Sequence, residues 1–250
     1  MKISAALQIA IDEYPDGNAL TKCVADARDM NRLFGGRKLL NADATLPAIL
    51  AALEETVATA RAGEWVVVWY SGHGTQLADD NGDEPDGIDE AIVDVELNCV
   101  RDDAIAKVLS QLRRDAFGLL GSDSCFSGAQ HRELRLVSPL LTAADLPAMR
   151  RSGVRGLPAS SVKAGRRTVG NVGEQPPLDR WVFFSGCADF EVSYEGPKNG
   201  VMTGAFKKAY KPGISVASLY QELTKAVKGW NQHPQLVCSP EARRWKLPSR

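Results

Sequence analysis

Two apolar runs that each lead to a reactive side chain constrain the fold of this chain more than any other feature. Residues 65–70 are Trp-Val-Val-Val-Trp-Tyr and are followed closely by His73, and residues 117–122 are followed in the same way by Cys125. A continuous apolar run is typical of a strand that is buried on both faces of a sheet. In open α/β sheets, reactive groups gather at the carboxyl ends of such strands. The sequence therefore predicts that His73 and Cys125 meet at one edge of a parallel sheet.

The rest of the chain alternates between strand-like and helix-like patterns. Further strands are expected near residues 1–11, 91–95, 181–187 and 235–238, and helices near residues 21–34, 46–62, 102–113, 202–210 and 215–229. Such alternation favours an α/β fold with a mainly parallel sheet and helices on both faces. We expect one domain over residues 1–250.

Residues 138–178 differ from the remainder in composition. Small residues and basic residues predominate there, the basic ones being Arg150, Arg151, Arg155, Lys163, Arg166 and Arg167. A segment of this kind buries little apolar surface, so we expect a mobile surface connection between a larger N-terminal part and a smaller C-terminal part.

Charge, cysteine content and hydropathy narrow the class of protein. A net charge of −1 gives no reason to expect a nucleic-acid or membrane partner. Five cysteines at scattered spacings fit neither a disulfide framework nor a paired-cysteine metal site, which favours reduced thiols in a cytoplasmic protein. No apolar run approaches the ~18–20 residues of a transmembrane helix.

A neighbouring thiol and imidazole can carry out nucleophilic catalysis. The imidazole of His73 would take the proton of Cys125, and the thiolate would attack a carbonyl carbon. The N–H groups of Gly74 and of Cys125 are the expected donors to the resulting oxyanion. A lone cysteine at a strand end is more often a small buried residue, but here both runs end in Ser- and Gly-rich surroundings. Cys187 is a rival nucleophile at the end of a third apolar run.

Several motifs together resemble a bacterial metacaspase. They are Cys23-Val24-Ala25-Asp26-Ala27-Arg28, Ser71-Gly72-His73-Gly74-Thr75-Gln76, the acidic run 79–90, Asp123-Ser124-Cys125-Phe126-Ser127-Gly128 and, more weakly, Ser185-Gly186-Cys187-Ala188-Asp189. The resemblance implies a caspase-like fold and a cysteine endopeptidase acting on protein or peptide substrates. It departs from the family pattern at Phe126, where a His is usual, and at Arg132, where an acidic residue is expected.

The resemblance also implies cleavage after Arg or Lys. The family's primary pocket carries over to Cys23, Asp26, Ser71 and Asp123. A buried cationic side chain needs opposite charge and hydrogen-bond acceptors, which these residues offer. Strand alternation points Asp123 and Cys125 to the same side. We also expect Asp189 near the substrate groove.

Calcium activation and self-cleavage are further implications. Calcium ligands would be Asp89, Asp102 and Asp103, whose oxygens suit a hard cation; the run 79–90 is not an EF-hand, because Glu84 replaces the turn glycine. Self-cleavage is expected within 138–178, since nicking concentrates in exposed loops. The family also suggests a monomer. Two alternatives stay open: a calcium-responsive interaction module of caspase-like fold without significant turnover, and a clostripain-like peptidase with the same dyad.

Overall fold

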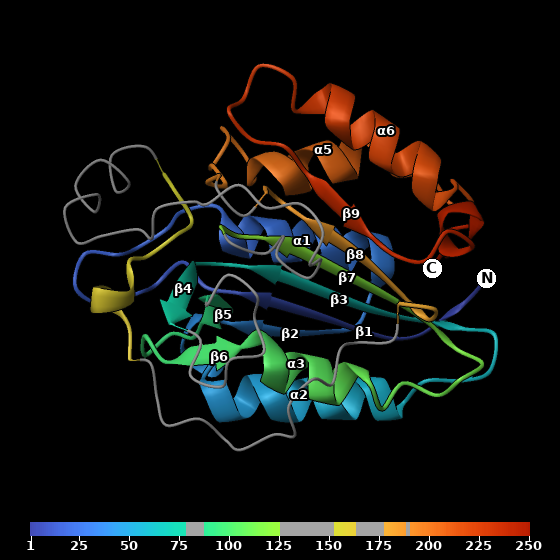
Figure 1. Ribbon diagram of the computed structural model, residues 1–250, viewed down its shortest axis with the longest axis horizontal. Coiled ribbons are helices and arrows are strands. Elements are labelled where there is room, and N and C mark those ends of the chain that lie inside the picture. The colour runs from blue at the N-terminus through green and yellow to red at the C-terminus, as the bar shows by residue number, and fades with distance from the viewer. Residues whose placement is uncertain (79–87, 126–152, 164–177, 189–190) are drawn as a thin grey trace.

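A central sheet of six strands organises the molecule (Figure 1). The computed structural model describes residues 1–78, 88–125, 153–163, 178–188 and 191–250. The strand order is β2-β1-β3-β7-β8-β9. These strands are β1 (Ile3–Ala10), β2 (Arg37–Leu40), β3 (Trp65–Ser71), β7 (Phe117–Asp123), β8 (Trp181–Ser185) and β9 (Gln235–Val237). All neighbouring pairs are parallel except β8 and β9, which are antiparallel.

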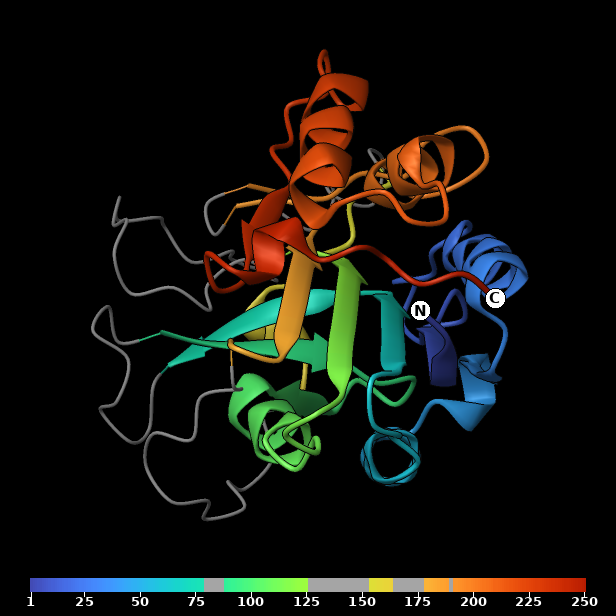
Figure 2. The same ribbon diagram turned by 90° about the vertical axis from the view of Figure 1, so that its right-hand side faces the viewer.

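Helices cover both faces of this sheet (Figures 1 and 2). One face carries α1 (Cys23–Phe34), α5 (Val201–Ala209) and α6 (Val216–Ala226), and the other carries α2 (Leu46–Ala58) and α3 (Asp102–Leu109). Successive side chains of β3 serve opposite cores: Val66 and Val68 belong to the core under α2 and α3, whereas Val67 and Trp69 belong to the core under α1, α5 and α6. This explains why the run is apolar throughout. No helix in the described part of the chain has the length and apolar character needed to cross a membrane.

The predicted strands and helices are present, most of them with shorter bounds, and three strands were missed. One is β2, and the other two, β4 (Gly74–Ala78) and β6 (Cys99–Arg101), join β5 (Ile88–Val93) in a separate antiparallel sheet. Each missed strand has three to five residues. A run this short shows too few positions for a period of two to be recognised.

The expectation that residues 138–178 bury little is wrong for residues 153–157. Val154, Arg155 and Leu157 are 6%, 0% and 2% exposed. The basic composition suggested a solvated segment, but the charge of Arg155 is met by buried carboxylates, as shown below. Arg150, Arg151, Arg166 and Arg167 lie outside the described residues, as do Phe126 and Arg132.

Candidate active site

Parallel pairing brings the two reactive side chains to the same edge of the sheet. Strands β3 and β7 are in register with Ser71 opposite Asp123, so His73 and Cys125 each follow two residues beyond the last paired position. The backbones approach closely there. A Cβ on Gly74 would overlap the carbonyl oxygen of Cys125 and lie 3.1 Å from its carbonyl carbon. Glycine at position 74 is therefore a condition of this arrangement.

The imidazole of His73 is buried and held from one side. Its Nε2 lies 2.7 Å from the carbonyl oxygen of Asn18, and its ring packs against that of Tyr14 with centroids 4.5 Å apart. Because a carbonyl oxygen can only accept, Nε2 carries the proton and Nδ1 is the basic atom of the neutral ring. The sequence offered no signal for Asn18, since it acts through its backbone.

Residues 153–157 lie in the site in the manner of a bound peptide. On one side, the N–H of Arg155 donates to the carbonyl oxygen of Ser193 at 3.0 Å, and the N–H of Glu195 donates to that of Gly153 at 2.9 Å. On the other side, the N–H of Leu157 donates to the carbonyl oxygen of Gly74 at 2.9 Å. The segment is therefore held before and after the Arg155–Gly156 peptide bond.

The carbonyl oxygen of Arg155 receives two hydrogen bonds. The N–H of Gly74 donates to it at 3.0 Å and the N–H of Cys125 at 3.1 Å. These are the two donors that the sequence analysis assigned to an oxyanion. The Sγ of Cys125 in turn accepts the N–H of Ser193 at 3.1 Å. Two converging donors suit an oxygen that gains negative charge during a reaction.

The guanidinium of Arg155 fills a pocket lined by the predicted residues. Its Nη2 lies 2.8 Å from Oδ2 of Asp26, and its Nη1 lies 3.4 Å from Oδ2 of Asp123 and donates to the carbonyl oxygen of Asp123 at 3.0 Å. Ser71 donates to Asp26 at 3.1 Å. All these side chains are fully buried. The pocket thus holds an arginine of the chain itself.

Burial shifts the ionisation of two groups in this pocket. It raises the pKa of the Asp26 carboxyl to about 7, against the opposing effect of Arg155 and with a smaller contribution from Asp123. Burial likewise raises the pKa of the Cys23 thiol, which therefore stays protonated at neutral pH. Cys23 forms part of the pocket wall and does not act as an anion there.

Three residues beside the guanidinium were not predicted as site residues. Glu195 lies with Oε1 3.7 Å from Nη2 of Arg155. Ser193 donates from its hydroxyl to Oδ1 of Asp123 at 2.7 Å. A Cβ on Gly200 would lie 2.6 Å from Cζ of Arg155, so the absence of a side chain there makes room for the guanidinium. These residues come from a loop without a recognisable pattern, so they could not be selected from the sequence.

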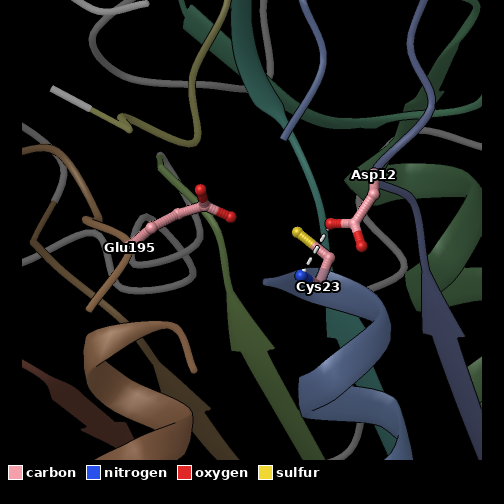
Figure 3. Close-up of side chains that lie close together, drawn as sticks. All are labelled: Asp12, Cys23 and Glu195. Carbon is pink, nitrogen blue, oxygen red and sulfur yellow. Dashed lines mark hydrogen bonds between the residues drawn. The ribbon is translucent and has the colours of Figure 1, made fainter. Parts of the chain in front are cut away.

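Asp12, Cys23 and Glu195 stand close together (Figure 3). Among the described residues they are the one group with ligand atoms near enough to hold a metal ion. However, both carboxyl oxygens of Asp12 already accept backbone N–H groups at the start of α1, from Cys23 at 2.8 Å and Val24 at 3.2 Å. Asp12 therefore caps the helix.

The predicted calcium ligands do not form a common site in this structure. The carboxylate of Asp89 is paired with the guanidinium of Arg101, and both side chains are nearly buried. Asp102 and Asp103 occupy the first turn of α3. Within the described ranges, these three do not appear as a group with converging ligand atoms. The three residues were predicted as ligands from the family resemblance, which carried no information about the pairing of Asp89 with Arg101. Asp189 lies outside the described residues.

Comparisons with known proteins agree with this fold. The chain is 29% identical to Metacaspase-1 of Kluyveromyces lactis, over 94% of this chain and 66% of that protein, and 27% identical to Metacaspase-1B of Aspergillus clavatus, over 94% of this chain and 68% of that protein. It is 34% identical to Metacaspase-4 of Arabidopsis thaliana, over 46% of this chain and 31% of that protein. The chain thus spans about two thirds of the length of the two fungal metacaspases and about a third of the length of the plant one.

Solved structures show the same architecture. Protein GSU0716 of Geobacter sulfurreducens superposes with a TM-score of 0.74 at 24% identity, covering 98% of this chain and 97% of that one. Caspase-1 of Spodoptera frugiperda superposes with a TM-score of 0.60 at 9% identity, covering 95% and 88%. Residues 3–244 match the protein family described as Caspase domain. The chain therefore belongs to the caspase-domain family, with metacaspases among its relatives.

Proposed function

We propose that this protein is a cysteine endopeptidase that cleaves after Arg or Lys, with Cys125 as nucleophile and His73 as base. One observation carries the proposal: Arg155 lies with its side chain between two buried carboxylates and its carbonyl oxygen on two converging N–H groups. A residue at the cleaved position of a substrate needs both of these contacts at once.

The reaction follows from the contacts of each group. Nδ1 of His73 takes the proton of the Cys125 thiol, and the thiolate attacks the carbonyl carbon on the carboxyl side of the arginine. The N–H groups of Gly74 and Cys125 hold the oxyanion. When the C–N bond breaks, His73 returns the proton to the leaving amine and a thioester remains. Water, deprotonated by His73, then hydrolyses the thioester, releasing the new carboxylate and restoring the thiol.

The first substrate under this proposal is the chain itself, at the Arg155–Gly156 bond. Residues on both sides of the bond are held by backbone hydrogen bonds, and the positively charged side chain is already in place. Cleavage would yield fragments 1–155 and 156–250. This narrows the expected self-cleavage to one of the six basic residues considered at first.

Incubation of the purified chain tests both statements. Wild type is expected to produce two fragments, the smaller with Gly156 at its N-terminus by mass spectrometry. Cys125→Ala and Arg155→Ala are expected to give no such fragment, and Lys163→Ala, a basic residue of the same segment, is a matched control that should be cut like wild type. Fragments from Cys125→Ala would remove Cys125 as nucleophile, and an unchanged Cys187→Ala would dispose of the rival thiol.

Cleavage of other proteins needs the 153–157 segment to leave the pocket. A fluorogenic peptide ending in arginine should therefore be cut by the self-cleaved wild type and by Arg155→Ala, and should not be cut by Cys125→Ala or by the double variant Cys125→Ala/Arg155→Ala. The family suggests that the protein acts as a monomer, which sedimentation of the Cys125→Ala variant would test.

Calcium activation stays a separate prediction, and the arrangement described does not fit it. Asp89 is paired with Arg101, so an ion would have to displace a buried guanidinium. No step of the reaction above depends on calcium. Cleavage rates with calcium and with a chelator measure it directly: equal rates would end the prediction, and a large increase would require Arg101 to move.

One observation favours the interaction module instead. Val154, Arg155 and Leu157 are almost fully buried, so the occupied site is closed to other peptides. A chain that neither cuts itself nor cuts an arginine peptide after Arg155→Ala, while remaining folded, would be assigned to this class.

A further inference from the structure

The carboxylate of Glu195 is held in place beside the guanidinium of Arg155. Its Oε1 accepts the N–H groups of Thr21 at 3.0 Å and Lys22 at 2.7 Å, and its Oε2 accepts the hydroxyl of Thr21 at 2.8 Å. Its side chain is only 9% exposed. A carboxylate that accepts three hydrogen bonds is held in one position. The distance between Glu195 and the guanidinium of Arg155 is therefore set by the fold of the loop.

The backbone of Glu195 belongs to the same site. Its N–H donates to the carbonyl oxygen of Gly153, two residues before the proposed bond. Glu195 therefore faces any peptide that lies as residues 153–157 do. Its carboxylate lies near the Cys23 thiol and the carboxylate of Asp12 (Figure 3). The guanidinium of Arg155 is the positive group beside Glu195 and Asp26. The carboxylates of Asp26 and Glu195 give the pocket a negative character that suits a cationic side chain.

The two ends of the guanidinium meet different carboxylates. Nη1 faces Asp123, by its carbonyl oxygen at 3.0 Å and its carboxylate at 3.4 Å. Nη2 faces Asp26 at 2.8 Å and Glu195 at 3.7 Å. A planar fork with two separate nitrogens can serve both sides, whereas lysine ends in a single nitrogen. A lysine in this pocket would leave at least one buried carboxylate without a positive partner.

We propose that Glu195 is a specificity-determining residue that makes this site prefer arginine to lysine at the cleaved position. The proposal rests on the proposed function for its consequence in catalysis, but the pocket can be tested without catalysis. Residue 155 of the chain itself serves as the probe.

The first experiment is a double-mutant cycle in self-cleavage. Arg155→Lys is expected to slow the appearance of the 156–250 fragment at least tenfold. Glu195→Gln, which keeps the shape and the acceptor oxygen, is expected to slow it about threefold to tenfold, as removal of a partly buried ion pair predicts. In the Arg155→Lys background, Glu195→Gln should change the rate less than twofold. Glu222→Gln, on the exposed surface of α6, is the matched control.

The second experiment uses the Cys125→Ala background, in which no bond can be cut. Glu195→Gln is expected to lower the urea midpoint of unfolding clearly more when residue 155 is arginine than in the Arg155→Lys background. An equal loss in both backgrounds, or equal self-cleavage of wild type and Arg155→Lys, would overturn the assignment of Glu195. Absence of cleavage in wild type would contradict the proposed function but not the assignment of Glu195. The urea midpoints still measure the interaction between Glu195 and residue 155 when no bond is cut.

Discussion

Two arginines of this chain lie where the sequence analysis expected a cation from outside. Arg155 occupies the pocket predicted for a substrate side chain, and Arg101 is paired with Asp89, a predicted calcium ligand. The difference lies in the backbone. Arg155 presents its carbonyl oxygen to two N–H groups beside Cys125, whereas Arg101 ends strand β6 and pairs through the sheet. A buried ion pair alone says little about function. The additional substrate-like backbone contacts of Arg155 are what support the proposed cleavage at this site.

Removing a carboxylate from the Arg155 pocket is expected to have the largest effect. Asp123→Asn keeps the shape but removes the charge facing Nη1, and it disturbs the bonds from Ser193 at 2.7 Å and from the N–H of Thr203 at 2.8 Å. Truncating one partner of a buried charge pair costs about 2–5 kcal/mol, which corresponds to roughly 30-fold or more in rate. Timed gels of self-cleavage measure it. Asp115→Asn, in an exposed pair with Arg113, is the control and should leave the rate unchanged.

The Arg101 pair is expected to affect stability and not cleavage chemistry. Asp89→Asn would remove the negative charge that is paired with a nearly buried guanidinium, which should lower the free energy of unfolding by about 1.5–3 kcal/mol. Urea unfolding in a chelating buffer, in the Cys125→Ala background, measures this. If the substitution mattered only when calcium is present, Asp89 would be a metal ligand after all, and the contrast between the two arginines would fail.

Some features of the fold and the site could be predicted from the sequence, and others could not. His73 and Cys125 each follow an apolar run by the same number of residues. Because the carboxyl ends of neighbouring parallel strands lie at the same edge of the sheet, this spacing predicts that the two residues meet there. Asp26 and Asp123 were placed in the pocket by resemblance, and both line it. The occupation of the pocket by Arg155 could not be predicted, because a basic, glycine-rich stretch is typical of a solvent-exposed segment. Glu195 and Asn18 could not be selected either, since their roles depend on long-range contacts between loops.

The size of the Arg155 pocket can be tested at Gly200. An alanine there would place its Cβ 2.6 Å from Cζ of Arg155 and into Oδ2 of Asp123. Overpacking of this kind costs about 1–3 kcal/mol, so self-cleavage by Gly200→Ala should fall by roughly fivefold to a hundredfold. Gly204→Ala on α5 is the control, because its Cβ would meet its nearest neighbour at an ordinary 3.6 Å. Gly213 is less suitable, because its positive φ would strain an alanine there. Unchanged cleavage by Gly200→Ala would mean that the pocket is wider than described.

A difference in pH dependence is expected between Asp26 and Asp29, which lie one turn apart on α1. Burial raises the pKa of Asp26 from 3.8 to about 7, so between these values the folded state keeps a proton that the unfolded state has released. Stability therefore falls as pH rises through this window, by ~1.4 kcal/mol per pH unit at most, and Asp26→Asn should flatten that slope.

Asp29 should behave in the opposite sense. Burial opposes the shift, but hydrogen bonds from Lys207 and Asn199 lower its pKa below 3.8. Its stabilising contribution is thus present above the unfolded value and is lost as pH falls through the folded one. Asp29→Asn should consequently reduce stability at neutral pH and lessen the loss on acidification. Urea unfolding of both variants from pH 3 to 8, in the Cys125→Ala background, compares them. If the free energy of unfolding of the two variants varied with pH in the same way, Arg155 would hold Asp26 ionised throughout this range. The pocket would then keep its full negative charge even in mild acid.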